Sequence, residues 1–417
     1  MPVLSDNPLW EAFGLRALAY TYYGGADLGE CFSTIDKIGL GTGEDWHREW
    51  TNTADRIFAA GRTAELAGHT VSARETYFRA TSYYRVSYIP LFGAPVDPRL
   101  ANAFVRETEA FQSAARLNDF PIEPVEIPFE GNLLPGYFIR ISGDETPRPT
   151  LIWVSGYDSD IQEDYFAHGP AAVRRGYNCL VVDGPGQGRN LIRDAIPLRP
   201  DWETVVRAVV DFAETRKEVD TQRMILAGWS FGGFLAPRAA AFEKRIAALI
   251  ADPGQWDQRE GLKSIPLAPG VLAAFPHVDP AVFSPFEEYL HSPKADPLTR
   301  WKILQRGFWV HGVNCLYDLA REINRFEVSS VAQNISCPTL ITAAEGDPVS
   351  SNAHTLFDAL RCPKTMIRFT IAEGSGGHCE ALARSLFHQR MFDWLDETLA
   401  SATTGSGKKQ ERQTMLI

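Results

Sequence analysis

Hydrophobic positions in the first 120 residues recur every three or four residues. The stretch TADRIFAAGRTAELAGHTVSARETYFRATSYYRVSYIPL (53–91) carries this spacing most clearly, and it is typical of helices with one buried face. Gly68 and His69 interrupt the pattern, which predicts a helical hairpin whose second helix is capped by Ser72. The many aromatic residues are interpreted as core, because buried rings dominate packing. Residues 1–120 are therefore predicted to form a helical cap or platform.

After Pro121 the spacing between hydrophobic positions becomes shorter. VEIPFEGNLLPGYFIRISG (125–143) alternates on both sides of a turn, which predicts antiparallel strands. Five short apolar runs follow, each ending in Gly, Asp or Ser: TLIWVSG, NCLVVDGPGQG, RMILAGWSFGG, AALIADPG and PTLITAAEGD. Helical stretches such as DWETVVRAVVDFAETRK separate most of them. This alternation predicts an α/β fold with a mostly parallel, doubly covered sheet, whose ligand crevice lies beyond the carboxyl ends of the strands.

The alternation stops between about residues 255 and 335. This segment is rich in Pro, Trp and Phe and contains helical pieces such as PLTRWKILQRGFWVHGVNCLYDLAREI. We interpret it as a helical lid inserted into a catalytic domain that spans 121–400. The polar end, SATTGSGKKQERQTMLI (401–417), is predicted to be a flexible tail.

Composition narrows the class of protein. A chain of 417 residues is long for one core and suggests a main domain with an added one. The net charge of −11 disfavours nucleic acid and anionic membrane surfaces as partners, and no apolar run is long enough to span a bilayer. The six cysteines are scattered, which disfavours a zinc site or a disulfide framework. With no secretory signal at the start, we predict a soluble cytoplasmic protein that uses no metal and no cofactor.

The strongest chemical signal is Gly228-Trp229-Ser230-Phe231-Gly232, between the strand RMILA and a helix. G-x-S-x-G in this setting is typical of a nucleophile elbow, a tight turn that exposes a serine. The backbone N–H of Phe231, at the start of the helix, is the first predicted oxyanion donor. The alternative is a glycine-rich turn in which the serine only caps the helix.

A nucleophilic serine needs a base that is oriented by an acid. In α/β-hydrolases the chain order is Ser, then Asp or Glu, then His. Asp347 ends the strand LITAAEGD, and His378 lies in the loop EGSGGHCE after the last predicted strand, TMIRFTIA. These two residues are predicted to complete a triad with Ser230. The other candidate bases lie in the insertion or on predicted helices: His291, His311, His354 and His388.

Two alternatives surround this assignment. Asp252 also ends a strand, and some hydrolases take their acid from that position, so it is a second candidate acid. It could instead line the substrate pocket, together with Trp229 beside the nucleophile, or cap a turn before Pro253.

The second oxyanion donor is expected in the loop after TLIWVSG. Tyr157 occupies that place, so its backbone N–H is predicted to donate. DGPGQGR (183–189) lacks the spacing of a phosphate-binding loop and is interpreted as a structural turn. Cys379, beside His378, lacks an elbow and is interpreted as packing.

At this point the chain resembles a known family. The helical N-terminal region with VSGYDS, DGPGQG, GWSFGG, AEGDPVS and GSGGHCE is similar to the fungal α/β-hydrolases of polyketide gene clusters, which include thiohydrolases, lactone cyclases and pigment polyketide-shortening hydrolases. More distantly it resembles the dihydropseudooxynicotine hydrolases. The resemblance places Ser230, Asp347 and His378 in the triad. It implies a polyketide acyl substrate, delivered by an acyl carrier protein of a synthase, and leaves a homodimer open.

Three hypotheses follow. In the first, Ser230 attacks an acyl (thio)ester and the acyl-enzyme is released to water or to a hydroxyl of the same chain, which gives a lactone. In the second, the same triad hydrolyses a carbon–carbon bond in a β-dicarbonyl chain. In the third, the protein is a binding module without catalysis, against which the complete Ser–Asp–His set argues.

Overall fold

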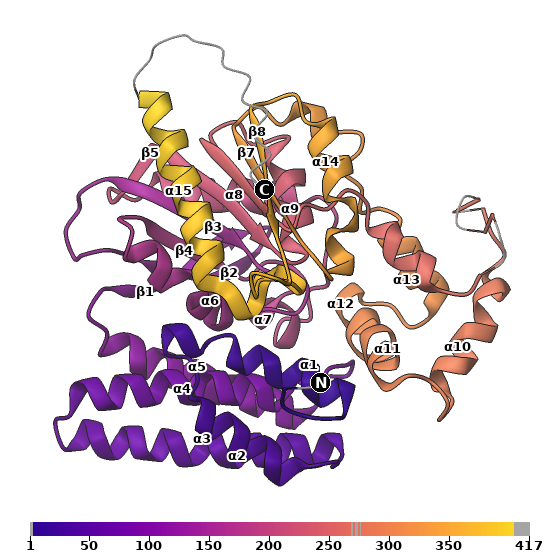
Figure 1. Cartoon of the computed structure of the whole chain (residues 1–417), viewed down its shortest axis with the longest axis horizontal. Helices are drawn as coiled ribbons and strands as arrows, with labels where there is room; N and C mark the ends of the chain where they lie inside the picture. Colours follow the sequence, from indigo (N-terminus) through magenta and orange to yellow (C-terminus); the bar gives the residue numbers. More distant parts are fainter. Residues whose placement is uncertain (1–2, 268–269, 272–273, 276, 404–417) are drawn as a thin grey trace. The chain divides into compact units, whose positions relative to one another are not determined.

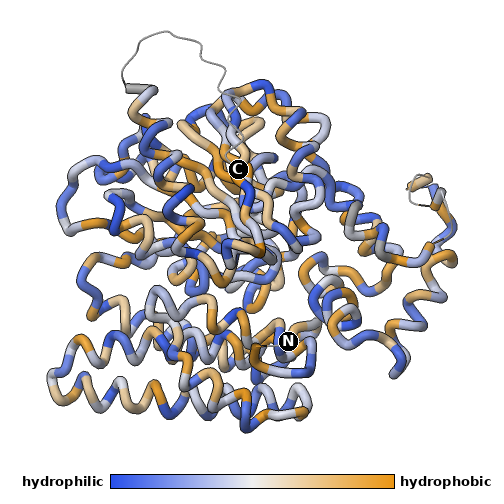
Figure 2. Tube along the Cα trace, viewed as in Figure 1, coloured by the Kyte–Doolittle hydropathy of each residue, from blue (hydrophilic) through white to orange (hydrophobic). Residues whose placement is uncertain are grey.

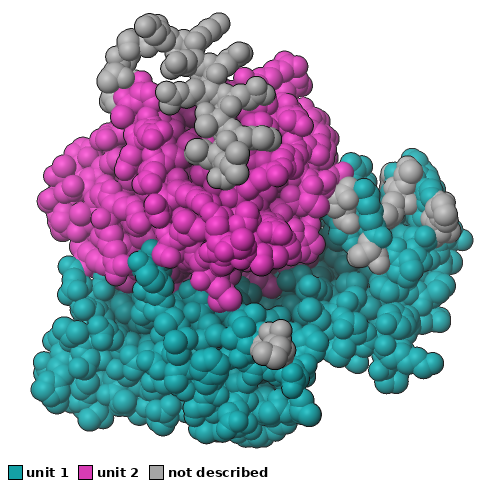
Figure 3. Space-filling model, viewed as in Figure 1, with its two compact units in different colours: residues 1–119, 191–198, 258–326 teal, residues 120–190, 199–257, 327–417 magenta. Residues whose placement is uncertain are grey.

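The computed structural model (Figure 1) describes residues 3–267, 270–271, 274–275 and 277–403. The chain divides into two compact units, coloured separately in Figure 3. Unit 1 comprises 1–119, 191–198 and 258–326, and unit 2 comprises 120–190, 199–257 and 327–417. Most of the segment predicted to be a lid therefore belongs to the same unit as the N-terminal helices, and its role as a lid stays a prediction. Apart from 401–403, the predicted tail lies outside the described residues.

Unit 2 is built on one eight-stranded sheet with the strand order β1-β2-β4-β3-β5-β6-β7-β8. The β1–β2 and β2–β4 pairs are antiparallel, and all other pairs are parallel. The strands are β1 (Ile122–Phe129), β2 (Asn132–Ile139), β3 (Arg148–Val154), β4 (Asn178–Val182), β5 (Val219–Trp229), β6 (Ala248–Asp252), β7 (Thr339–Ala344) and β8 (Lys364–Phe369). The predicted α/β class with a mostly parallel sheet is confirmed.

Helices cover both faces of this sheet, as its continuous apolar strands require. The helices are α6 (Ile161–Val173), α7 (Gly188–Ile192), α8 (Trp202–Glu214), α9 (Gly232–Ala240), α14 (Ala353–Ala359) and α15 (Arg384–Thr403). Figure 1 shows α15 crossing in front of the sheet, with α8 and α9 behind it. An ion pair of 3.0 Å between Arg238 and Glu203 joins α9 to α8. The rings of His168 and His388, 6.3 Å apart, join α6 to α15.

Strands β4 and β6 are buried along their whole length, and β3 and β5 are buried toward their carboxyl ends; Figure 2 shows the sheet as the most hydrophobic part of unit 2. The parallel register pairs Val154 with Gly228, and Trp229 with Asp252. The carboxyl ends of β3, β5 and β6 therefore meet at one edge of the sheet. Side chains that follow these strands are brought together there, as expected for an open parallel sheet.

The N-terminal part of unit 1 is helical. Its helices are α1 (Pro8–Leu18), α2 (Leu28–Ile38), α3 (Gly43–Leu66), α4 (Thr70–Ser87) and α5 (Pro98–Arg116). α3 and α4 form a hairpin that turns at Gly68, which has φ +78°, and they approach closely where a Cβ on Gly61 would lie 2.8 Å from Tyr77. α4 begins at Thr70 after His69, so the prediction of a cap at Ser72 is wrong: that residue lies inside the helix.

Aromatic side chains form the core of unit 1, as their periodicity indicates. Trp46 and Trp50 are fully buried, and the Trp46 ring stacks on Trp10 with 4.8 Å between centroids. The inserted segment contributes α10 (Ser284–His291), α11 (Pro297–Arg300), α12 (Phe308–His311) and α13 (Leu316–Ile323). Within unit 1, Trp301 Nε1 donates to Ile89 O at 3.0 Å. Among the described residues, no helix combines the length and hydrophobicity that a bilayer crossing requires.

Candidate active site

Ser230 lies in a tight turn between β5 and α9 and has a left-handed backbone, with φ +54°. Non-glycine residues rarely adopt this conformation without support from their surroundings. The support here is close backbone packing. A Cβ on Gly228 would lie 2.0 Å from Gly232 O, and a Cβ on Gly232 would lie 2.2 Å from Val154 O. Only glycine at these two positions lets strand and helix meet at this distance, which explains the G-x-S-x-G pattern.

The structure brings the side chains of Ser230, His378 and Asp347 into one hydrogen-bonded series. Ser230 Oγ lies 2.8 Å from His378 Nε2. On the other side of the ring, His378 Nδ1 lies 3.0 Å from Asp347 Oδ2 and 3.1 Å from Oδ1. The carboxylate can only accept, so it favours the tautomer with the proton on Nδ1. Nε2 is then an acceptor facing the serine hydroxyl.

The carboxylate is held more tightly than the imidazole. The Asp347 side chain is fully buried, whereas that of His378 is 45% exposed. Asp347 follows β7 and caps the short 3-10 helix Pro348–Asn352, with Oδ1 accepting from Val349 N at 2.9 Å. Gly377 N donates to Glu345 O at 2.8 Å, which ties the loop of His378 to the end of β7. An ordered acid beside an accessible base is suited to proton transfer.

Asp252, the second candidate acid, has other partners. Its side chain is fully buried and accepts from Arg384 Nη1 at 3.1 Å and from Thr342 Oγ1 at 2.9 Å. Its backbone oxygen accepts from Ser230 N at 2.6 Å. The carboxylate that bonds to His378 is therefore Asp347, whereas Asp252 supports the turn of Ser230 through its backbone oxygen.

Arg384, at the start of α15, joins Asp252 to the His378 loop. Besides its bond to Asp252, Arg384 Nη1 donates to Cys379 O at 2.9 Å, and Nη2 lies 3.3 Å from His168 Nδ1. Cys379 and Glu380 both have positive φ, +52° and +47°. The guanidinium thus anchors the backbone where the loop is strained.

Burial sets the protonation of this cluster. It raises the pKa of Glu380 well above its usual value, with a further contribution from the neighbouring Asp252 carboxylate. Burial thus favours the neutral form of Glu380 beside the Asp252 carboxylate, which is paired with the Arg384 guanidinium. Burial likewise raises the pKa of the Cys379 thiol well above its usual value, so this cysteine stays a neutral thiol, 3.5 Å from His378 Nε2.

Trp229, predicted to line the substrate pocket, is 7% exposed. Its Nε1 donates to Asp164 Oδ1 at 2.9 Å, and Ser155 Oγ donates to the other oxygen of the same carboxyl. Burial raises the pKa of Asp164 well above its usual value. The polar groups of both Trp229 and Asp252 are bonded inside unit 2, so a contact of either with substrate stays a prediction.

The two predicted oxyanion donors flank Ser230. Phe231 occupies the N-cap position of α9, and Tyr157 follows β3 with its ring centroid 5.1 Å from that of Phe231. A Cβ on Gly156 would lie 3.4 Å from Ser230 Oγ, so the loop after β3 approaches the serine closely. Backbone N–H groups in such a place are suited to hold a developing oxyanion.

Several residues that support the site escaped prediction from the sequence: Asp164 and Arg384, described above, and Gln187 and Gln255, whose amides donate to Gly156 O and to Ser230 O. Gln187 lies in DGPGQGR, a motif interpreted as a turn. Its position within a conspicuous glycine-rich loop was a usable signal. Arg384 and Asp252 are 132 residues apart, and no local pattern marks their pairing.

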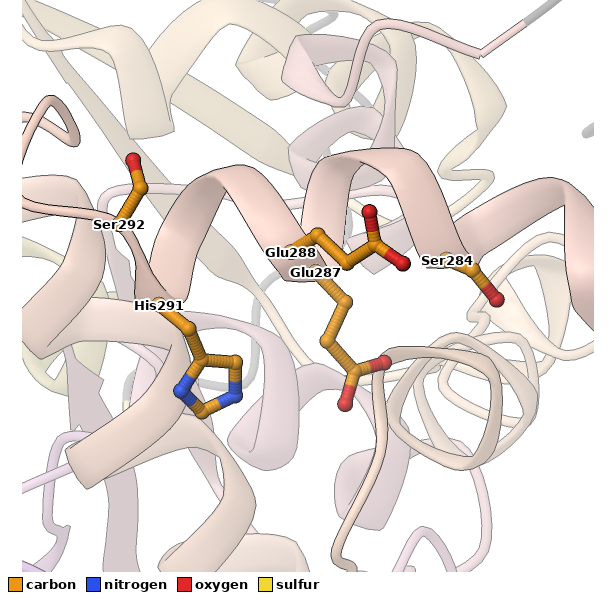
Figure 4. Close-up of a pocket in the computed structure, with 5 residues that line it drawn as sticks. All are labelled: Ser284, Glu287, Glu288, His291 and Ser292. Atoms are coloured by element: carbon orange, nitrogen blue, oxygen red, sulfur yellow. The ribbon is translucent and has the colours of Figure 1, made fainter.

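A separate cavity of about 540 Å³ lies along α10 in unit 1 (Figure 4). Its lining residues are Ser284, Glu287, Glu288, His291 and Ser292. Glu287 accepts from Leu316 N at 2.9 Å, so it connects α10 to the start of α13. Within the described part of the chain, no three His, Cys, Asp or Glu side chains are grouped so as to hold a metal ion.

This chain is similar to several known hydrolases over most of its length. The hydrolase acrC of Aspergillus aculeatus is 32% identical over 92% of this chain and 95% of its own length. The 20-hydroxy-prefusarin hydrolase FUS2 of Gibberella moniliformis is 32% identical over 93% and 95%. The crystal structure of the 2,6-dihydroxy-pseudo-oxynicotine hydrolase matches with a TM-score of 0.72 at 22% identity, covering 92% of this chain and 96% of that one. The resemblance predicted from the motifs is confirmed.

The model of the alpha/beta hydrolase family matches residues 133–388, more than half of the chain and all of the strands from β3 to β8. The sheet order and the fungal hydrolases among the relatives agree with that match. The chain therefore belongs to the alpha/beta hydrolase family.

Proposed function

We propose that this protein is a serine hydrolase in which Ser230 is the nucleophile, His378 the general base and Asp347 the orienting acid. The observation that carries the proposal is the continuous series from Ser230 Oγ to His378 Nε2 at 2.8 Å and from His378 Nδ1 to Asp347 at 3.0 Å. Nucleophile, base and acid in this sequence of contacts are the arrangement that activates serine.

The mechanism follows from these contacts. His378 Nε2 takes the proton as Ser230 Oγ attacks an acyl carbonyl, and the buried Asp347 carboxylate stabilises the imidazolium. The tetrahedral intermediate collapses when His378 returns the proton to the leaving group, which leaves an acyl-Ser230 ester. The backbone N–H groups of Phe231 and Tyr157 stabilise the oxyanion, each by about 3 kcal/mol of barrier.

The proposed substrate is a polyketide acyl (thio)ester of secondary metabolism. A relative named for the hydrolysis of 20-hydroxy-prefusarin, and the motifs shared with fungal polyketide hydrolases, support this class. Release to water gives an acid, and release to a hydroxyl of the same chain gives a lactone. In this proposal an acyl carrier protein presents the chain, and segment 255–335 serves as the lid that excludes bulk water.

The test uses a β,δ-dioxo acyl thioester that carries a distal hydroxyl, with products identified by mass. Free thiol together with an acid or a lactone is expected from the wild type. Ser230→Ala is expected to abolish release, whereas the exposed Ser329→Ala serves as a matched control with wild-type rates.

Two outcomes oppose the proposal. Full turnover by Ser230→Ala would exclude the serine mechanism. A shortened chain still joined to its thiol would place the scissile bond between carbons, so that the same residues would act in a carbon–carbon hydrolase.

A further inference from the structure

Two buried glutamines lie behind the two proposed oxyanion donors. The N–H of Phe231 belongs to the peptide group whose carbonyl is that of Ser230, and the N–H of Tyr157 belongs to the peptide group whose carbonyl is that of Gly156. Gln255 Nε2 donates to Ser230 O, and Gln187 Nε2 donates to Gly156 O at 3.0 Å. Each donor peptide thus accepts a side-chain amide at its opposite end.

Gln187 is 1% exposed, and partners on three sides fix its orientation. Its Nε2 donates to Ser155 O at 2.8 Å as well as to Gly156 O, and its Oε1 accepts from Gly184 N at 3.0 Å. Two carbonyl oxygens can only be met by the NH₂ group and one N–H only by the oxygen, so the partners determine which atom is nitrogen. The side chain therefore connects DGPGQGR to the loop after β3.

Gln255 serves the elbow in a comparable way. It follows β6 and is 4% exposed. The Ser230 carbonyl that it meets also accepts from Gly233 N at 2.9 Å, and Ser230 N donates to Asp252 O at 2.6 Å. The Ser230–Phe231 peptide is therefore held from the side away from its N–H.

Because of the geometry of the peptide group, holding the carbonyl oxygen also sets the direction of the N–H. A trans peptide is planar, and its N–H points away from its C=O. Fixing the carbonyl oxygen therefore fixes the direction of the N–H. A hydrogen bond accepted by the carbonyl also polarises the peptide and strengthens its N–H as a donor. This polarisation is larger in a buried setting than in water.

We propose that Gln187 and Gln255 are positioning residues that aim and polarise the two oxyanion donors, the N–H groups of Tyr157 and Phe231. The inference rests on the proposed serine mechanism. Neither glutamine touches the reacting atoms: each acts through one peptide group. DGPGQGR then has a role in the reaction beyond forming a turn.

The test compares Gln187→Met and Gln255→Met with the wild type. Met preserves length and burial but removes the amide. Three quantities are measured on an acyl ester: kcat, KM and the inhibition constant of an alkylboronic acid, whose adduct with serine places an oxygen where the oxyanion forms. Complete loss of an oxyanion donor lowers kcat by 10²–10³-fold, so a donor that is no longer aimed is expected to lower it on the order of 10- to 100-fold.

For the two Met variants we expect KM to stay within about twofold and boronate affinity to fall in proportion to kcat, because only the tetrahedral state uses the donors. A purely structural role predicts a different pattern, in which stability falls and boronate affinity does not change. Asn190→Leu is the matched control. Asn190 is a fully buried amide in the same region that donates to Asp183 O at 2.8 Å, a carbonyl outside the two donor peptides. It is expected to lower stability without changing boronate affinity.

The outcomes separate this inference from the serine mechanism. Labelling of the wild type at Ser230 by a fluorophosphonate, together with boronate binding, establishes the mechanism, and absence of both would remove it. With labelling intact, wild-type kcat and boronate affinity in folded Gln187→Met and Gln255→Met would overturn the positioning role. If a Met variant fails to fold, the Leu variant of the same glutamine (Gln187→Leu or Gln255→Leu) replaces it: Leu also removes the amide donor, and a wild-type kcat in the folded variant would again overturn the inference.

Discussion

The loop that carries Ser230 and the loop that carries His378 meet at one hydrogen bond, yet they are held in different ways. Both contain a non-glycine residue in the left-handed region, with φ +54° at Ser230 and +52° at Cys379. The serine loop is packed closely, backbone against backbone, with the Gln255 amide as a side-chain contact: besides the two contacts of the elbow, a Cβ on Gly233 would lie 2.1 Å from Pro253 O. The histidine loop has a backbone bond from Gly377 N to Glu345 O, but at its left-handed residue Cys379 it is held by the side chain of Arg384.

This difference explains why one loop can be recognised from the sequence and the other cannot. Close backbone approach requires glycine, so it leaves a visible motif. A side-chain anchor leaves one charged residue among the many on the chain, and its partner lies elsewhere. The comparison also implies that the two loops will fail differently, the first through added volume and the second through lost charge.

The largest effect is expected from Arg384→Met. It leaves the Asp252 carboxylate buried without its guanidinium, and breaking a buried pair in this way costs about 3–5 kcal/mol. Cys379 O also loses its donor, so kcat is expected to fall together with the free energy of unfolding. Denaturant titration and ester hydrolysis measure the two quantities.

A double variant sharpens this result. Asp252→Asn added to Arg384→Met removes the uncompensated charge and is expected to restore part of the stability but not the position of the loop. A single variant as stable as the wild type would show that backbone contacts alone hold the histidine loop.

Gly228→Ala tests the other loop. Its new Cβ would lie 2.0 Å from Gly232 O, so the elbow has to shift, and a displacement of about 1 Å costs on the order of 100-fold in rate. Gly143→Ala is the matched control, because a Cβ there meets nothing within 4 Å. Equal hydrolysis rates in the two variants would contradict the role given to backbone packing.

The same contrast explains which parts of the molecule the sequence could predict. The mostly parallel sheet followed from apolar runs between helices, and Ser230, Asp347 and His378 followed from their positions after β5, β7 and β8. Gln187 and Arg384 could not be assigned a role, because their partners are carbonyl oxygens and a carboxylate that only the folded chain brings near. The cap at Ser72 failed because α4 starts two residues earlier, at Thr70.

The side-chain anchor should also depend on pH. Burial lowers the pKa of His168 and of His388 well below the ordinary 6.5, and the positive charge of Arg384 lowers both further. Below pH 6.5 the unfolded chain therefore binds protons that the folded chain does not, so each histidine makes stability fall as pH falls, by about 1.4 kcal/mol per pH unit.

The raised pKa values of Asp164 and Glu380 act in the opposite direction, since there the folded chain binds the extra protons. The useful measurement is therefore a difference. The free energy of unfolding of the wild type minus that of His168→Gln is expected to decrease from pH 6.5 to pH 5.5 by about 1 kcal/mol, because the unfolded histidine is only half protonated at pH 6.5. A difference that does not change with pH would mean that His168 takes up its proton in the folded chain as it does in the unfolded chain.

The smallest expected effect measures how much a left-handed residue costs in this protein. Glu130 is a further left-handed residue of unit 2, with φ +48°, and together with Gly131 at φ +82° it forms the two-residue turn between β1 and β2. Such turns favour Asn-Gly, so Glu130→Asn is expected to raise the free energy of unfolding by about 0.5–1 kcal/mol. The exposed ion pair with Arg199 offsets little of this gain, and hydrolysis is expected to stay at the wild-type rate. The gain measured by denaturant titration is the free-energy cost of one left-handed residue without special packing. The close glycine contacts around Ser230 must offset at least this cost, and so must the Arg384 side chain at Cys379. If Glu130→Asn gives no gain, positive φ is not costly in this sheet, and the two loops would need no anchors to hold their conformations.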